Sequence, residues 1–183
     1  YPEATREVID AEGWYHTGDL GTFDPDGCVR IIGRKKDIFL TSEGSNIAPA
    51  QIESALEADS LIRQAVLVGD RQPFLCALLV PEAAKVAEAL GVASPSPTGF
   101  GASDVHSLLW SRVETLNTQL EVHERIKKIL VLENELPLAV RGATGLLGKV
   151  RTSRAAVDEI YREQIAVLYL TNRTAGGSTK GET

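Results

Sequence analysis

Short apolar runs, separated by glycine, proline and acidic residues, follow one another along the chain, and their spacing predicts its elements. Extended runs at 13–23 and 27–33 flank the turn sequence DPDG, whose Asp, Pro and Gly occupy positions that a type I turn favours. The pattern therefore predicts a β-hairpin over residues 13–33.

A strand, a loop and a helix are predicted after the hairpin. Residues 35–41 favour a short strand, and the polar run 42–46 favours a loop. A helix is expected to begin near Pro49, because proline suits the first helical position. Its apolar stripe is formed by Ile52, Ala55 and Leu56.

Strands and helices alternate through the rest of the chain, which is typical of an α/β or α+β fold. The expected elements are strands at 64–69 and 74–80, helices at 82–90 and 103–125, a strand at 127–133 and a helix at 153–169. The inward positions of the two longer helices are Leu109, Val113, Leu116, Leu120, Val157, Ile160, Tyr161, Ile165 and Leu168. We expect a small mixed sheet of about three strands flanked by helices.

The composition is that of a globular chain, with 43% apolar and 24% charged residues, and it argues against a disordered, collagen-like or coiled-coil protein. The 25 acidic and 19 basic residues give a net charge of −6, so nonspecific binding to nucleic acid is not expected. The chain contains no methionine, which predicts that it was processed or cut from a longer protein.

The sequence predicts neither a membrane-spanning segment nor a disulfide, a metal site or a common catalytic motif. The longest apolar runs, 76–81 and 165–170, are too short to span a bilayer. Cys28 and Cys76 are expected to be reduced structural residues, which suits a cytoplasmic protein. The three histidines are too scattered for a metal site, and the sequence has no P-loop or catalytic serine motif.

Three short segments carry residues that could contact a nucleotide, and each also has a simpler interpretation. Asp19 could accept hydrogen bonds from the diol of a ribose, or it could simply end a strand. The cations at 34–36, followed by the loop 42–46, favour a polyanion, or they form a solvated turn. Lys149, on a glycine-flanked loop before a helix, could reach a neighbouring cleft, or it is an ordinary surface lysine.

The joint order of these segments resembles the adenylate-forming superfamily, which contains acyl-CoA synthetases, luciferases and the adenylation domains of peptide synthetases. Residues 13–53 look like two consecutive signatures of that family, Tyr-x-Thr-Gly-Asp and Gly-Arg-x-x-Asp, the second continuing to Ile-x-Pro-x-x-Ile-Glu. The interval of 15 residues from Asp19 to Arg34 also fits the family. The sequence GKVR at 148–151 resembles its final signature.

The resemblance implies roles for the matching residues. Asp19 and Arg34 would bind ATP or AMP, the first through the ribose hydroxyls and the second through the ribose and phosphate. Lys149 would be the catalytic lysine that bridges the substrate carboxylate and the α-phosphate. Ser42 and Gly44 would line the channel for the pantetheine arm of CoA.

The resemblance also implies a division of the chain. Residues 1–35 would be the end of a large N-terminal adenylating domain, and residues 36–169 a mobile C-terminal domain. Residues 170–183 would be a flexible tail. Lys36 would lie at the hinge about which the C-terminal domain rotates.

One branch of the family fits best. The RKKD sequence followed by Ile47-Ala48-Pro49 looks most like long-chain fatty acyl-CoA synthetases, and Leu40 stands where luciferase and coumarate-ligase relatives usually carry a lysine. We therefore expect the C-terminal portion of an AMP-forming acid–thiol ligase, which adenylates a fatty acid and transfers the acyl group to CoA. The implied cofactors are ATP, CoA and Mg²⁺, and the ligands of Mg²⁺ would lie in the N-terminal domain. Without that domain this chain would be inactive.

Two alternatives remain open. The enzyme could be a fatty acyl-AMP ligase that delivers its product to the phosphopantetheine of a carrier protein. The chain could also be a non-catalytic module that kept the fold. The resemblance leaves open a peripheral association of the full-length enzyme with membranes, and it gives no oligomeric state.

Overall fold

A three-stranded sheet forms the centre of the computed structural model, which describes residues 2–42, 44–92, 101–137 and 153–170. The strand order is β5 (Ile62–Val68), β6 (Leu75–Pro81) and β7 (Ile126–Val131). β5 and β6 are antiparallel, whereas β6 and β7 are parallel. The small mixed sheet expected from the sequence is therefore confirmed.

The central strand β6 is buried on both faces, which explains why its sequence is almost continuously apolar. Every residue from Leu75 to Val80 is buried. Successive side chains of a strand point to opposite faces, so Leu75, Ala77 and Leu79 join one apolar cluster and Cys76, Leu78 and Val80 join another. Burial raises the pKa of the Cys76 thiol to about 11, so this cysteine stays protonated at neutral pH.

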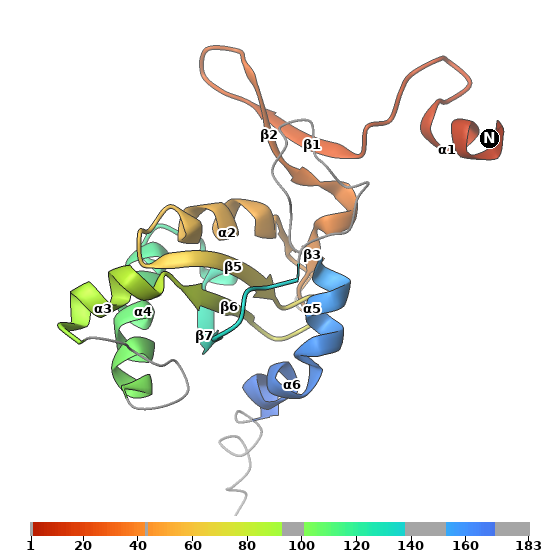
Figure 1. Cartoon of the computed structure of the whole chain (residues 1–183). Coiled ribbons are helices and arrows are strands. Elements are labelled where there is room, and N and C mark those ends of the chain that lie inside the picture. Colours follow the sequence, from red (N-terminus) through yellow and green to blue (C-terminus); the bar gives the residue numbers. More distant parts are fainter. Residues whose placement is uncertain (1, 43, 93–100, 138–152, 171–183) are drawn as a thin grey trace, which may run out of the picture.

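Helices cover both faces of the sheet (Figure 1). One face packs against α2 (Pro49–Glu57), α3 (Ala83–Leu90) and α4 (Ala102–Asn117). The other face packs against α5 (Arg154–Ile160) and α6 (Arg162–Leu170). The domain thus has three layers, and the apolar stripe of each helix supplies one side of a core.

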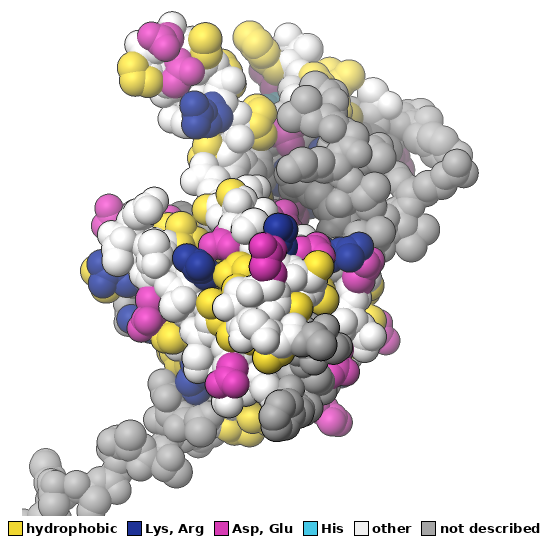
Figure 2. Space-filling view, turned by 60° about the vertical axis from the view of Figure 1, so that its left-hand side comes forward, with side chains coloured by type: hydrophobic (Ala, Val, Ile, Leu, Met, Phe, Trp, Pro, Cys, Tyr) yellow, Lys and Arg dark blue, Asp and Glu magenta, His cyan; other side chains and the backbone are white. Residues whose placement is uncertain are grey.

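A β-hairpin projects from this layered body, as the sequence predicts, but its first strand is shorter than the extended run expected over 13–23. β1 (Asp19–Phe23) and β2 (Val29–Arg34) are antiparallel, and a turn that contains Gly27 joins them. Phe23 and Ile31 of the hairpin are 75% and 60% exposed. The space-filling view shows apolar side chains on the part that stands apart from the rounded body (Figure 2). A short helix, α1 (Pro2–Val8), precedes the hairpin and was not expected from the polar N-terminal sequence.

The segment between the hairpin and α2 differs from the single strand expected over 35–41. It begins with a 3-10 helix, η1 (Lys35–Asp37), and continues as a two-residue strand, β3 (Phe39–Leu40). β3 pairs with β4 (Asn46–Ile47). The pairing is short because Thr41 turns the chain, its N–H donating to the carbonyl of Ser45.

Two of the predicted helices were too long. α4 ends at Asn117 instead of continuing to 125. The side-chain amide of Asn117 bonds both the N–H and the C=O of Ile126. A 3-10 helix, η2 (Val122–Glu124), occupies part of the segment between α4 and β7. The last helix is interrupted at Tyr161, so α5 and α6 are separate.

Two expected core positions were also wrong. Ile160 is 58% exposed, because Val157 and Tyr161 are the residues of this turn that face the second cluster, and Ala55 of α2 is exposed. Leu116 and Leu120 pack against the first cluster, and Tyr161, Ile165 and Leu168 against the second.

Some sequence predictions fall outside the described residues. They are most of the loop 91–101, most of the irregular stretch 134–149 with the following residues to 152, and the tail from 171. Among the helices that are described, none is long and apolar enough to cross a membrane.

The burial of β6 leads to a prediction about stability. Leu79→Ala should lower the free energy of unfolding by about 3 kcal/mol, because a fully buried leucine leaves a cavity when it is truncated. The matched control Leu170→Ala removes a leucine that is 60% exposed and should cost less than about 0.5 kcal/mol. Urea unfolding of both variants measures the difference, and equal costs would contradict the assignment of β6 to the core.

Candidate functional site

Asp19 and Arg34, predicted from the sequence as nucleotide ligands, meet across the hairpin. They are the first residue of β1 and the last residue of β2, and the strand register places them opposite each other. The guanidinium Nε of Arg34 donates to Oδ1 of Asp19 at 3.0 Å. The side chain of Arg34 is 38% exposed and that of Asp19 is 33% exposed, so both remain accessible to a ligand.

Local backbone geometry fixes the position of Asp19. Gly18 has a φ of 72°, a conformation that glycine adopts without strain. Its carbonyl accepts the N–H of Lys35 at 2.8 Å, which closes the hairpin next to the pair. The hydroxyl of Thr17 accepts the N–H of Asp19 at 3.1 Å. The Thr-Gly-Asp sequence therefore places the carboxylate of Asp19 on a tight turn that hydrogen bonds hold in position.

This pair suits a ligand that carries both hydroxyls and negative charge. Asp19 retains acceptor capacity after it accepts the bond from Arg34, because a carboxylate has about four lone-pair positions. The remaining N–H groups of Arg34 can donate to a ribose oxygen or a phosphate, for which a planar guanidinium is well suited. Within the described residues, no group of three or more His, Cys, Asp or Glu side chains could hold a metal ion.

The other predicted site residues lie in separate places. Lys36 is exposed in η1, directly after the hairpin. Ser42 and Gly44 are exposed in the loop between β3 and β4, and Gly44 has a φ of 85° with open space where a Cβ would lie. Lys149 lies outside the described residues.

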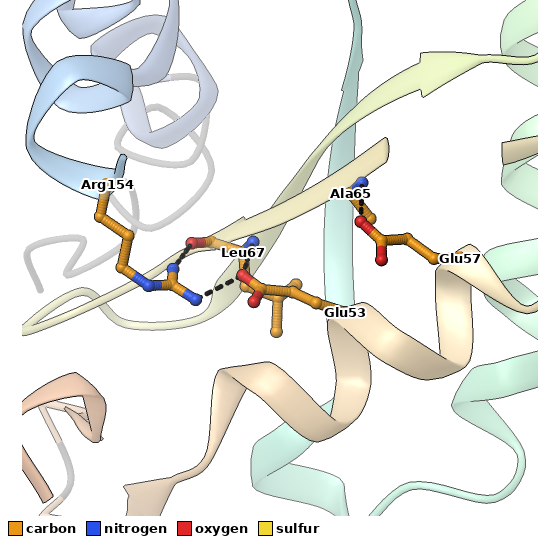
Figure 3. Close-up of polar contacts among 5 residues, drawn as sticks. All are labelled: Glu53, Glu57, Ala65, Leu67 and Arg154. Atoms are coloured by element: carbon orange, nitrogen blue, oxygen red, sulfur yellow. Dashed lines mark hydrogen bonds and ion pairs between the residues drawn. The ribbon is translucent and has the colours of Figure 1, made fainter. Parts of the chain in front are cut away.

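An ion pair on the body of the domain was missed by the sequence reasoning. Arg154, at the start of α5, donates from Nη2 to Oε1 of Glu53 on α2 at 2.5 Å and from Nη1 to the carbonyl of Leu67 on β5 at 2.9 Å (Figure 3). Its guanidinium also lies 5.0 Å from the ring centroid of Phe39. Arg154 thus joins two helices, the sheet and the strand that leads to the loop of Ser42 and Gly44.

The carboxylates of α2 also bind the edge of the sheet. Oε1 of Glu53 accepts the N–H of Leu67 at 2.8 Å, and Oε1 of Glu57 accepts the N–H of Ala65 at 3.2 Å (Figure 3). These bonds satisfy backbone groups of β5 that face away from β6, which an edge strand otherwise leaves unpaired. The quoted signature contains Glu53, but nothing in the sequence pointed to Arg154, 101 residues later, as its partner.

A small cavity lies beside this ion pair. Its volume is about 290 Å³, and its lining includes Phe39, Gly69, Asp70, Arg154 and Tyr169. The hydroxyl of Tyr169 donates to the carbonyl of Val68 at 3.0 Å, and burial raises the pKa of this tyrosine. The cavity is therefore walled by structural contacts that hold α5 and α6 on the sheet.

The partly buried ion pair leads to a second prediction. Arg154→Ala should lower the free energy of unfolding by about 2–3 kcal/mol, because it leaves the carboxylate of Glu53, 15% exposed, without its cation. Arg63→Ala is the matched control, since Arg63 pairs with Glu135 where both side chains are more than half exposed, and it should cost less than about 0.5 kcal/mol. Urea unfolding of both variants is the measurement, and a cost for Arg154→Ala no larger than that of the control would contradict the bridging role.

Comparison with known proteins shows a family for the larger part of the chain. The model of the AMP-binding enzyme C-terminal domain matches residues 36–173. Long-chain-fatty-acid–CoA ligase FadD15 of Mycobacterium tuberculosis (strain ATCC 25618 / H37Rv) is 36% identical over 178 residues, which cover 91% of this chain and 28% of the relative. Long-chain-fatty-acid–CoA ligase ACSBG2 of Mus musculus is 32% identical over 190 residues, with 92% and 28% covered.

The structural comparison agrees. The A domain of carboxylic acid reductase from Segniliparus rugosus, solved with AMP and a co-purified carboxylic acid, superimposes with a TM-score of 0.70 at 25% identity. The match covers 93% of this chain and 25% of that chain. The chain thus spans between a quarter and a third of the length of these relatives. It belongs to the family of AMP-binding enzyme C-terminal domains.

Proposed function

We propose that this chain is the C-terminal part of an ATP-dependent, AMP-forming fatty acid–CoA ligase. The observation that carries the proposal is the Asp19–Arg34 pair, which offers a carboxylate and a guanidinium to one ligand just before the segment that matches the family model. The two relatives described above, both named as long-chain-fatty-acid–CoA ligases, support the same substrate class.

The proposed reaction has two steps. In the first, the carboxylate of the fatty acid attacks the α-phosphorus of ATP, which gives acyl-AMP and pyrophosphate. Asp19 and Arg34 hold the ribose and phosphate of the nucleotide, and Lys149 stabilises the negative charge of the transition state. In the second step the thiol of CoA attacks the acyl carbonyl and AMP leaves.

A rotation about a hinge would let one domain serve both steps. Lys149 is needed while charge develops on the phosphate, whereas the loop with Ser42 and Gly44 is needed when the pantetheine arm enters. Lys36 is exposed in the 3-10 helix between the hairpin and the layered body, where a change of backbone angles would turn one against the other. We accordingly assign residues 1–35 to the adenylating domain and 36–169 to the mobile domain.

The partner of the mobile domain would be the N-terminal domain of the same enzyme. That domain would supply the fatty-acid pocket and the ligands of Mg²⁺, and the exposed apolar residues of the hairpin would pack against it. We expect a cytoplasmic enzyme. The 183-residue chain alone should therefore form no acyl-AMP from ATP and a fatty acid.

A second candidate differs only in the acceptor. The structural similarity to the A domain of a carboxylic acid reductase shows that the likeness extends beyond CoA ligases. The acyl group could then pass to the phosphopantetheine of a carrier protein. A thiol-exchange assay of the full-length enzyme, with CoA and a carrier protein as competing acceptors, separates the two candidates.

The proposed role of Lys149 is tested in the full-length enzyme. Lys149→Ala should lower the rate of acyl-AMP formation at least about 100-fold, because a positioned cation contributes several kcal/mol to the transition state. Thioester formation from supplied acyl-AMP and CoA should stay within about twofold of the wild type, because no phosphate charge develops in that step. An equal loss of both steps would contradict the role.

The proposed hinge requires the opposite pattern. Lys36→Pro fixes the φ angle of the hinge residue, so the enzyme should still form acyl-AMP but lose most of its thioester formation. Radiolabelled fatty acid, followed separately as acyl-AMP and as acyl-CoA, measures both steps. An unimpaired thioester step in this variant would overturn the hinge assignment.

A further inference from the structure

The turn between β5 and β6 is bonded to the strand that leads into the loop of Ser42 and Gly44. Oδ1 of Asp70 accepts the N–H of Leu40 at 3.0 Å, and the N–H of Arg71 donates to the carbonyl of Leu40 at 2.8 Å. The N–H of Ser42 donates to the carbonyl of Gln72 at 3.3 Å. Three hydrogen bonds thus join two segments that lie 30 residues apart in the sequence.

The turn adopts an unusual conformation to make these bonds. Arg71 has a φ of 58°, in the left-handed region that residues with a side chain rarely occupy. The carbonyl of Gly69 accepts the N–H of Gln72 at 3.0 Å and closes the turn. Leu40 of β3 bonds to this turn through both its N–H and its C=O. The unusual backbone conformation of Arg71 therefore serves the contact with this one residue.

Hydrogen bonds of Thr41 hold the base of the loop. The N–H of Thr41 donates to the carbonyl of Ser45, and the hydroxyl of Thr41, a buried residue, accepts the N–H of Ser45 at 3.0 Å. Ser42 and Gly44 are exposed at the tip. The position of the tip therefore depends on what holds Leu40 and Thr41.

We propose that Asp70 is a positioning residue for the thiol-transfer step, because its carboxylate fixes Leu40 and thereby the loop of Ser42 and Gly44 relative to the rigid sheet. The inference rests on the proposed function, in which this loop lines the channel for the pantetheine arm. Asp70 does not touch the substrate; it acts through the backbone of Leu40. A displacement of about 1 Å in a group that orients a reactant is enough to lower a rate up to 100-fold.

The contacts single out Asp70 within the turn. The bonds from Arg71 and Gln72 use backbone groups, which every residue type provides, whereas the bond to the N–H of Leu40 needs a side-chain acceptor. The Asp70 side chain is 52% exposed, so its truncation should leave the core unchanged. Phe39, the residue before Leu40, is buried and stays anchored in the core.

The full-length enzyme provides the test, with the two steps assayed separately. Asp70→Ala should lower kcat/KM for CoA about tenfold in thioester formation from supplied acyl-AMP, while fatty-acid-dependent exchange between ATP and pyrophosphate stays within about twofold. Asp70→Asn should restore most of the loss, because its amide oxygen can still accept from Leu40. Equal losses in both steps, or no loss in Asp70→Ala, would overturn the proposal.

Asp59→Ala is the matched control at the other end of β5. The carboxylate of Asp59 likewise accepts a backbone N–H, that of Leu61 at 2.9 Å, but it lies in the turn before β5 and does not hold the loop. Both half-reactions should stay within about twofold of the wild type in this variant. A tenfold selective loss of thioester formation in Asp59→Ala would contradict the proposal, since that effect would not be specific to the loop.

A second readout separates this inference from the proposed function. In Asp70→Ala, amide hydrogen exchange should become at least about tenfold faster at Leu40–Ser42, with β5 and β6 unchanged. If the wild-type enzyme forms neither acyl-AMP nor thioester, the proposed function fails, and faster exchange still shows that Asp70 holds the loop. Unchanged exchange in Asp70→Ala would overturn the inference even in an active ligase.

Discussion

The burial of β6 on both faces is the constraint on which the rest of the structure depends. A strand covered on both sides must be almost wholly apolar, and Leu75–Val80 meets that requirement. Helices α2 to α4 are then confined to one face and α5 and α6 to the other. Because such a core is close-packed, the sheet is a rigid frame to which the loop of Ser42 and Gly44 is bonded.

Side chains bind backbone groups on both edge strands of this frame. Glu53, Glu57 and Arg154 bind backbone groups of β5, and Asn117 binds both backbone groups of Ile126 at the start of β7. An unprotected edge in a sheet of three strands would invite pairing with another chain. The same bonds hold α2, α4 and α5 in place, so polar residues of these helices contribute to the architecture.

The sequence was most informative where local rules apply. The hairpin turn, the start of α2 at Pro49 and the strand β6 follow from backbone preferences and from the placing of apolar runs, and the structure confirms them. The end of α4, the interruption at Tyr161 and the Arg154–Glu53 pair depend on partners far away in the chain, which no local pattern encodes. The Asp19–Arg34 contact lies between these cases, because the hairpin register brings together two residues that the signature motifs had already singled out.

The proposed domain rotation has to be compatible with the attachment of two segments, the loop of Ser42 and Gly44 and the helix α5. Arg154 binds the carbonyl of Leu67 near the end of β5, and the turn that follows β5 holds Leu40 through Asp70. Arg154 also lies over the ring of Phe39, directly before Leu40. The loop of Ser42 and Gly44 and the helix that begins five residues after Lys149 are thus fixed to the same end of one strand. Since bonded and packed groups of this kind do not move past one another easily, the proposed rotation would take place outside the sheet. The exposed segment around Lys36, which carries no core residue, is the part of the described chain best suited to it.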